Sequence, residues 1–248
     1  PYKRKKITNI NVLSVKILHI IYKCDILKLR SDFMITKLIM KNFKSFKNET
    51  TIDFTKTNYK VLDTSNVSDS GVLKGMMFVG ANASGKSNAL LAIRLLLDLL
   101  FMEKDINYGL FACLFSGKPE FSLDYYFNIE DKEIRYFFEV DLKNTMLSEK
   151  LYVDKKILLE RMGVTAKSYI TDNENYNELD KETLFLRTIY FNTRFAGNEI
   201  LHKWFEFLQS SIYLNAFYKC VISYGKLDFR ITKYIEEKGT EEINQFFK

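Results

Sequence analysis

The feature that most constrains the fold is the stretch GANASGKS at residues 80–87, which fits the pattern G-x-x-x-x-G-K-[ST]. The apolar run MMFV at residues 76–79 precedes it and has the length of a buried parallel strand. An apolar segment with helical spacing follows, from Ser87 to about Met102. The pattern therefore predicts a strand, a glycine-containing loop and a helix in direct succession.

Each residue type of this loop suits the binding of phosphate. Gly80 and Gly85 let the backbone turn sharply and bring its N–H groups close to phosphate oxygens. The helix that follows adds the partial positive charge of its N-terminus. Lys86 supplies an ammonium for the β and γ phosphates, and the Ser87 hydroxyl can ligate the Mg²⁺ that bridges them. A strand-to-helix turn that binds nothing would not need a lysine followed by a serine.

Composition and charge indicate a globular chain with an unusual N-terminus. Of the 248 residues 47% are hydrophobic, which is enough to build one substantial core or two small ones. Residues 1–33 hold eight basic and two acidic side chains, which accounts for the whole net charge of +6. The rest of the chain is neutral and gives no independent support for contact with DNA.

We divide the chain at Met34, because alternating apolar positions begin there. Residues 1–33 are either translated upstream sequence or a basic arm that contacts a partner, and residues 34–248 form the domain that contains the loop. The N-terminal apolar stretches are interrupted by Lys16, His19 and Lys23, so they predict neither a membrane span nor a signal peptide. The three cysteines have no paired spacing, and we expect reduced thiols in a cytoplasmic protein.

Periodicity predicts several strands and helices. Hairpins are expected over 35–43 with 49–54, and over 121–129 with 134–142, where apolar residues alternate with polar ones. Shorter strands are expected at 150–153 and 156–160, and helices at 181–186, 198–209 and 231–247. A polar loop is expected at 55–75.

The segment ITKLIMKNFKSFKNETTIDF at 35–54, together with GANASGKSN at 80–88, resembles the N-terminal ATP-binding segment of ABC-type ATPases of the SMC, RecF and OLD kind. The bacterial AAA family ATPases that carry the spelling YGANASGKSN are the most similar subgroup. The similarity extends more weakly over most of residues 34–220, and it implies that residues 34–248 are the N-terminal part of an ABC-type ATPase domain. Ala83 replaces the glycine common in SMC proteins, a change that the subgroup itself tolerates.

The resemblance implies a set of nucleotide-binding residues in the loop and the first turn of the helix. Lys86 would also take part in catalysis, and Ser87 would ligate the metal. Lys44 and Ser45 in the NFKSF turn would approach the nucleotide, although an exposed turn without that role explains them equally well. The expected binding residues are Gly80, Ala81, Asn82, Ala83, Ser84, Gly85, Lys86, Ser87 and Asn88.

An ABC-type ATPase also needs a Walker B strand, a signature motif and a switch histidine, because hydrolysis requires a group that positions water and contacts from a second subunit. None is recognisable. Asp98 lies on the helix after the loop, the sequence FSG at 115–117 comes too early for a signature, and His19 and His202 have no catalytic neighbours in the sequence. Because the chain ends inside an apolar helical pattern, we expect a longer protein whose missing motifs follow.

These observations predict an α/β P-loop NTPase, an ABC-ATPase-like lobe with a mixed central sheet and an antiparallel β portion. The expected cofactors are ATP and Mg²⁺. By family analogy the complete protein would hydrolyse ATP as a homodimer and act with DNA or a nuclease, in DNA maintenance or phage defence. Two alternatives remain: another P-loop enzyme such as a kinase or GTPase, although N-K-x-D is absent, or a nucleotide-dependent interaction module without turnover.

Overall fold

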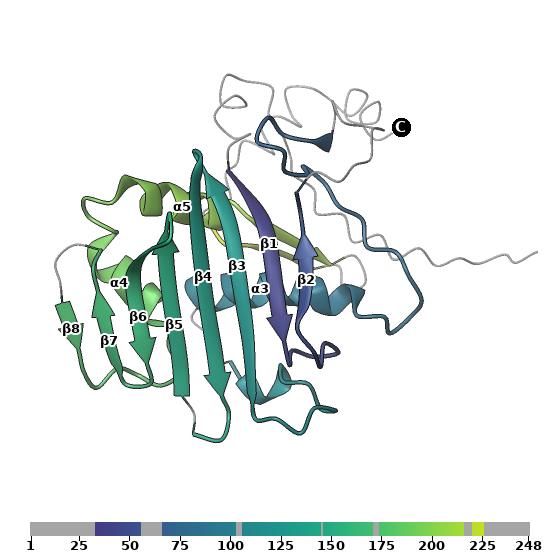
Figure 1. Cartoon of the computed structure of the whole chain (residues 1–248), viewed down its shortest axis with the longest axis horizontal. Coiled ribbons are helices and arrows are strands. Elements are labelled where there is room, and N and C mark those ends of the chain that lie inside the picture. The colour runs from purple at the N-terminus through teal and green to yellow at the C-terminus, as the bar shows by residue number, and fades with distance from the viewer. Residues whose placement is uncertain are drawn as a thin grey trace, which may run out of the picture.

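The computed structural model describes residues 33–55, 66–102, 106–144, 146–170, 174–215 and 220–225. Within these residues the chain forms one large antiparallel sheet, a two-stranded sheet and three α-helices (Figure 1). The predictions for residues 1–32, for residues 56–65 of the predicted 55–75 loop and for the helix at 231–247 lie outside the described residues.

The large sheet has the strand order β2-β1-β3-β4-β5-β6-β7-β8, and each neighbouring pair is antiparallel. Both predicted hairpins are confirmed as β1–β2 and β3–β4, and both shorter strands are confirmed as parts of β5 and β6. The strands are β1 (Phe33–Lys41), β2 (Thr50–Asp53), β3 (Glu120–Ile129), β4 (Lys132–Asp141), β5 (Met146–Val153), β6 (Lys156–Met162), β7 (Thr165–Ser168) and β8 (Glu174–Tyr176).

The alternating pattern of β3 and β4 places one set of side chains in the core. Tyr125 lies opposite Tyr136 and Leu123 opposite Phe138, and all four are buried. Successive residues of a strand point to opposite faces, so the polar residues between them lie on the other face of the sheet. The aromatic residues at period two therefore form core, as their spacing indicates.

The three helices α3 (Lys86–Phe101), α4 (Phe185–Thr193) and α5 (Glu199–Gln209) cover one face of the sheet; Figure 1 shows them behind it. A short 3₁₀ helix, η1 (Tyr108–Leu110), follows α3. The helix predicted at 87–102 is confirmed as α3, whose mostly buried surface agrees with its apolar sequence. The helix predicted at 198–209 is confirmed as α5, which Asn198 caps.

A second, small hairpin of β9 (Ile212–Asn215) and β10 (Cys220–Ser223) lies against α3. The guanidinium of Arg94 lies 4.6 Å from the ring centroid of Tyr213. The hydroxyl of Tyr224 donates to Asp98 at 2.7 Å, and Arg94 donates to the same carboxylate at 3.2 Å. The polar stripe of α3 therefore holds the hairpin, which gives Asp98 a structural role.

The prediction of a buried parallel strand at 76–79 is wrong for the described part of the chain. This segment forms no strand pairs, and Met77 and Val79 are 74% and 79% exposed. A parallel strand becomes buried only when neighbouring strands and helices surround it. In the described residues both edges of β1 are taken by β2 and β3, and no strand lies beside the segment.

The prediction of a mixed central sheet is likewise not met, because all strand pairs among the described residues are antiparallel. The antiparallel portion of the prediction is confirmed. A mixed sheet would require a parallel neighbour, and the only segment expected to supply one was 76–79. Periodicity reports burial and spacing but not the direction of the neighbouring strand.

The helix predicted at 181–186 begins later, at Phe185, and runs to Thr193. Residues 180–183 instead form a turn in which the Asp180 carboxylate accepts from the backbone N–H of Thr183 at 2.9 Å. The buried carboxylate of Glu149 then accepts the N–H groups of Phe185 and Leu186 at 2.7 and 3.1 Å. This long-range partner fixes the start of α4, and local sequence carries no sign of it.

Candidate functional site

The loop at 80–87 has a backbone that requires its glycines. Gly80 and Gly85 have φ values of 155° and 93°, which side-chain-bearing residues rarely adopt. Ala83 also has a positive φ, 63°, a conformation that costs a residue with a Cβ about 1 kcal/mol. The chain therefore holds a strained, exposed loop immediately before α3.

The first turn of α3 offers unpaired backbone donors. Gly85 is the N-cap, and it has no side chain that could accept from the first N–H groups. The first bond within the helix runs from Ala89 N to Gly85 O at 3.0 Å, so in the described part of the chain Lys86, Ser87 and Asn88 have amides without an acceptor. No acidic residue lies in this turn. Such a helix start attracts an anion.

The opposite end of α3 is neutralised by an arginine. The guanidinium of Arg187, on α4, donates to the carbonyl oxygens of Leu100 and Met102 at 2.8 and 3.1 Å. A cation at the C-terminus stabilises the helix through its dipole. The N-terminus has no corresponding partner in the described residues. Carbonyl groups at the C-terminal end of α3 are therefore paired, and within this part of the chain the first N–H groups at its N-terminal end are not.

The side chain of Lys86 folds back over the loop. Its Nζ donates to the carbonyl oxygens of Gly80 and Ala81 at 2.9 and 2.6 Å, and to Ser84 Oγ at 3.3 Å. An ammonium has three N–H donors, so all three are used inside the loop. The Lys86 ammonium is therefore held against the backbone of the loop.

The NFKSF turn lies against this loop. Asn88 Nδ2 donates to Ser45 Oγ at 2.9 Å. A Cβ on Gly85 would lie 2.9 Å from Ser45 Oγ and 3.0 Å from the Phe46 ring. The turn therefore packs so closely that only glycine fits at position 85.

Lys44 occupies the tip of the same turn in a left-handed conformation, with φ 51°. Its backbone N–H donates to Phe111 O at 2.7 Å, and its ammonium lies 5.2 Å from the centroid of the Phe111 ring. The side chain forms no salt bridge within the described residues. Ser45 is thus brought to the loop directly, and Lys44 lies beside it.

All expected binding residues, Gly80 to Asn88, come together in this one loop and helix start. Gly85 is buried and Lys86 and Asn88 are half-buried, while Ser87 and the residues from Gly80 to Ser84 are exposed. Ser87 could offer its exposed hydroxyl to a metal. In the part of the chain that the structure describes, no group of three or more His, Cys, Asp or Glu side chains could hold a metal ion.

The residues set aside as mimics of other motifs lie apart from the loop contacts. Asp98 is bonded to Arg94 and Tyr224, as described above. Phe115 is 84% exposed in the loop before β3, and Ser116 bonds within that loop. His202 lies 3.5 Å from Glu206 on the surface of α5. Among the described residues, none of them forms a hydrogen bond or ion pair with residues 80–88.

Sequence reasoning missed the contact between Asn88 and Ser45 and the packing of Phe46 on Gly85. The two bonded residues are 43 positions apart. The sequence offered one indication that the two segments meet. The motifs NFKSF and GKSN are both present, and the resemblance implies that both lie near one nucleotide. The geometry of their contact has no local signature.

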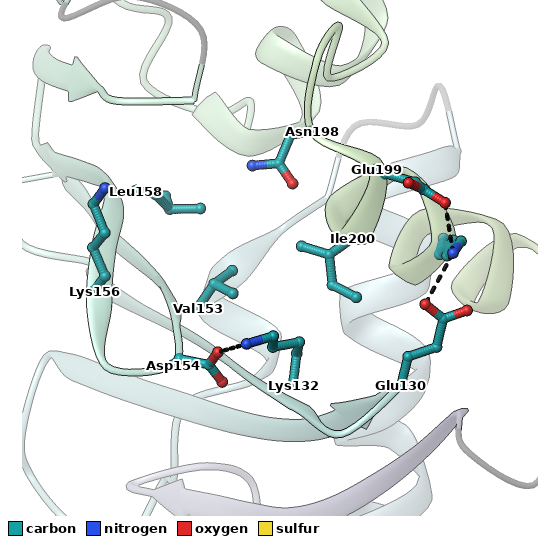
Figure 2. Close-up of a pocket in the computed structure, with 10 residues that line it drawn as sticks. Glu130, Lys132, Val153, Asp154, Lys156, Leu158, Asn198, Glu199 and Ile200 are labelled. Atoms are coloured by element: carbon teal, nitrogen blue, oxygen red, sulfur yellow. Dashed lines mark hydrogen bonds and ion pairs between the residues drawn. The ribbon is translucent and has the colours of Figure 1, made fainter.

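A separate hollow of about 510 Å³ lies between the turns after β3 and β5 and the start of α5 (Figure 2). Its apolar floor is Val153, Leu158 and Ile200. Five of its six charged lining residues pair with one another, and Lys156 is the exception: Lys132 pairs with Asp154 at 2.6 Å, and Lys203 with Glu130 and Glu199 at 2.9 and 2.7 Å. With these charges paired and none of its lining residues in the loop, it is the weaker candidate.

Comparison with known families places the loop inside a recognised domain. A family model described as AAA domain, putative AbiEii toxin, Type IV TA system matches residues 76–203, just over half of the chain. The match begins in the apolar run before the loop and ends in α5. No curated protein matches the chain. No helix within the described residues combines the length and the apolar character needed to cross a membrane.

Proposed function

Because the chain belongs to this family of AAA domains, we propose that its loop at residues 80–87 binds the triphosphate of ATP together with Mg²⁺. The observation that carries the proposal is the unpaired start of α3, where three backbone amides, the helix dipole and the Lys86 ammonium converge on an exposed loop. An anion is the ligand that such a site favours.

The residues have distinct roles in this proposal. The amides of the loop and of the first turn of α3 hold phosphate oxygens, and Lys86 neutralises the charge of the β and γ phosphates. The ammonium keeps its contacts with Gly80 O and Ala81 O or exchanges them for phosphate oxygens. Ser87 ligates Mg²⁺ through its hydroxyl, and the metal, when bound, shields the charge on the β and γ phosphates. Asn82, Ala83 and Ser84 wrap the phosphates through their backbone.

Lys44 and Ser45 belong to the same site in this proposal. The Ser45 hydroxyl lies on Gly85, and the Lys44 ammonium has no carboxylate partner in the described residues. A second ammonium beside a bound polyphosphate stabilises the complex, because it neutralises more of the phosphate charge.

We further propose that the protein is an ABC-type ATPase of the SMC, RecF and OLD kind, that the complete protein hydrolyses ATP, and that it does so as a homodimer in the cytoplasm. The support is the spelling GANASGKSN, the NFKSF turn beside it and the antiparallel sheet that follows α3. DNA or a nuclease as partner rests on the family analogy alone.

A second candidate is a nucleotide-dependent interaction module that binds ATP without turnover. It is favoured by the absence of a recognisable Walker B strand, signature or switch histidine from the 248 residues. Both candidates require binding at Lys86, and only the first requires hydrolysis.

Calorimetric titration of ATP in the presence of Mg²⁺ tests the binding proposal. We expect binding heat for the wild type and its loss in Lys86→Ala, with the fold intact because the ammonium contacts only the loop. At about a hundred times its dissociation constant, ATP should also stabilise the wild type by roughly 2.7 kcal/mol. Lys167→Ala removes an equal charge from an exposed position of β7, and this variant should bind ATP normally. A wild type with neither heat nor melting shift would refute the proposal.

A further inference from the structure

The side chain of Asn88 is turned away from the helix that it helps to begin. Asn88 is the third residue of α3, the position from which a polar side chain commonly reaches back to the N-cap. Here its amide group instead donates to Ser45 Oγ at 2.9 Å. The contact joins the helix that follows the loop to the turn between β1 and β2.

The direction of this hydrogen bond determines which hydrogen-bonding capacity the Ser45 hydroxyl retains. A serine hydroxyl has one O–H donor and can accept through its lone pairs. Because Asn88 donates to Ser45 Oγ, the O–H of Ser45 stays available to a further acceptor. Ser45 is exposed, so that acceptor can come from outside the chain.

The turn is fixed on its other side by the loop after α3. Phe43 and Phe46 close it through two backbone bonds of 3.0 and 2.8 Å, and Lys44 N donates to Phe111 O at 2.7 Å. The Phe43 ring lies over the Phe111 ring with their centroids 6.0 Å apart. The turn is therefore held between two elements, and among the described residues Asn88 supplies its hydrogen bond to α3.

We propose that Asn88 is a positioning residue for nucleotide binding, which acts through Ser45. By holding the turn on the loop, it directs the Ser45 O–H and the Lys44 ammonium toward oxygens of a nucleoside triphosphate bound at residues 80–87. This inference rests on the proposed function and deepens it, since it assigns the Asn88 side chain, expected from the resemblance to bind the nucleotide, a role that acts through Ser45.

The opposing explanation is that the Asn88–Ser45 bond only stabilises the fold. The two explanations differ in what they change. A bond that only joins two elements lowers the melting temperature of the free protein when it is removed, and leaves the affinity of the folded protein unchanged. A positioning bond weakens ATP binding at temperatures where each variant is fully folded.

A double-mutant cycle on the full chain separates them. The dissociation constant for Mg·ATP is measured by calorimetry for the wild type, Asn88→Ala, Ser45→Ala and the double variant, well below the lowest melting temperature of the four. Removal of one hydrogen bond of ordinary strength corresponds to about a three- to tenfold loss of affinity. We expect this loss in each single variant and no further loss from Asn88→Ala once Ser45 is already alanine.

Asn144→Ala is the matched control, because it removes an exposed asparagine side chain that bonds only to nearby Asp141. It should bind ATP as the wild type does. Wild-type affinity in Asn88→Ala, or losses that multiply in the double variant, would overturn the positioning role while Lys86-dependent binding still stood. A wild type that binds no ATP would overturn both proposals. If Asn88→Ala does not fold, the test rests on Ser45→Ala, which changes an exposed residue. Wild-type affinity of Ser45→Ala for Mg·ATP would then overturn the positioning role of Asn88.

Discussion

Glu149 and Arg161 form an ion pair inside the core, with Arg161 Nη1 3.1 Å from Glu149 Oε1 and both side chains at most 1% exposed. Each partner also bonds elsewhere. Glu149 accepts from Tyr136 at 2.9 Å and from the first amides of α4, and Arg161 donates to the carbonyl oxygens of Thr183, Gly163 and Asp180. The pair therefore fastens α4 and the turn before it to the middle of the sheet.

Removal of one partner should leave an uncompensated buried charge. We expect Glu149→Ala to lower the free energy of unfolding by roughly 3–5 kcal/mol, as measured by urea denaturation. Lys150→Ala, its neighbour on the opposite face of β5, breaks an exposed pair with Glu160 and should cost about 1 kcal/mol or less. Equal losses in the two variants would contradict this account of the core.

Gly85→Ala should disturb both the fold and the site. The substitution forces a Cβ at φ 93° and within 2.9 Å of Ser45 Oγ. We expect a loss of about 1–3 kcal/mol from strain and the absence of an ATP-dependent melting shift. Gly117→Ala separates the two causes, since it shares a positive φ of 70° but meets nothing within 4 Å. Scanning calorimetry with and without Mg·ATP should show the larger loss at position 85.

Deletion of residues 1–32 should change the melting temperature little, because their basic charge and irregular pattern separate them from the domain. In the structure β1 begins at Phe33, one residue before the predicted division at Met34. Phe33 pairs with Ile129, and its ring lies 6.3 Å from that of Phe207. Deletion of residues 1–33 should therefore cost more than deletion of 1–32. A large drop for the shorter deletion would show that the segment packs on the core.

The chain should bind ATP without turning it over at the rate of a complete ABC-type ATPase. Lys86 and Ser87 position the phosphates, but no residue identified in the sequence activates water or completes the site from the far side. Loss of such groups commonly costs about 10³ to 10⁵ in rate. A phosphate-release assay that finds Lys86-dependent turnover of about 1 s⁻¹ or faster would mean that a catalytic acid or base has been overlooked.

The spacing of apolar and polar residues predicted correctly the strands and helices whose conformation depends mainly on residues close by in the sequence. The alternation in 121–129 and 134–142 gave β3 and β4 because a half-buried strand needs that period wherever it lies. Helix α3 follows from sixteen helix-compatible residues after a glycine N-cap. The prediction at 76–79 failed because burial of an apolar run depends on which strands surround it, and the run itself does not specify them.

The site divides in the same way. The sequence alone determined where the proposed phosphate-binding loop lies, since glycines, a lysine and a serine at this spacing specify a backbone and a charge within eight residues. Only the tertiary structure decided that β1 pairs with β3 across about eighty intervening residues, that Glu149 starts α4, and that Ser45 meets Asn88. Such contacts form when elements distant in the sequence pack into one core. The pattern of each element is compatible with several arrangements, and only the arrangement that buries all the apolar faces together is stable.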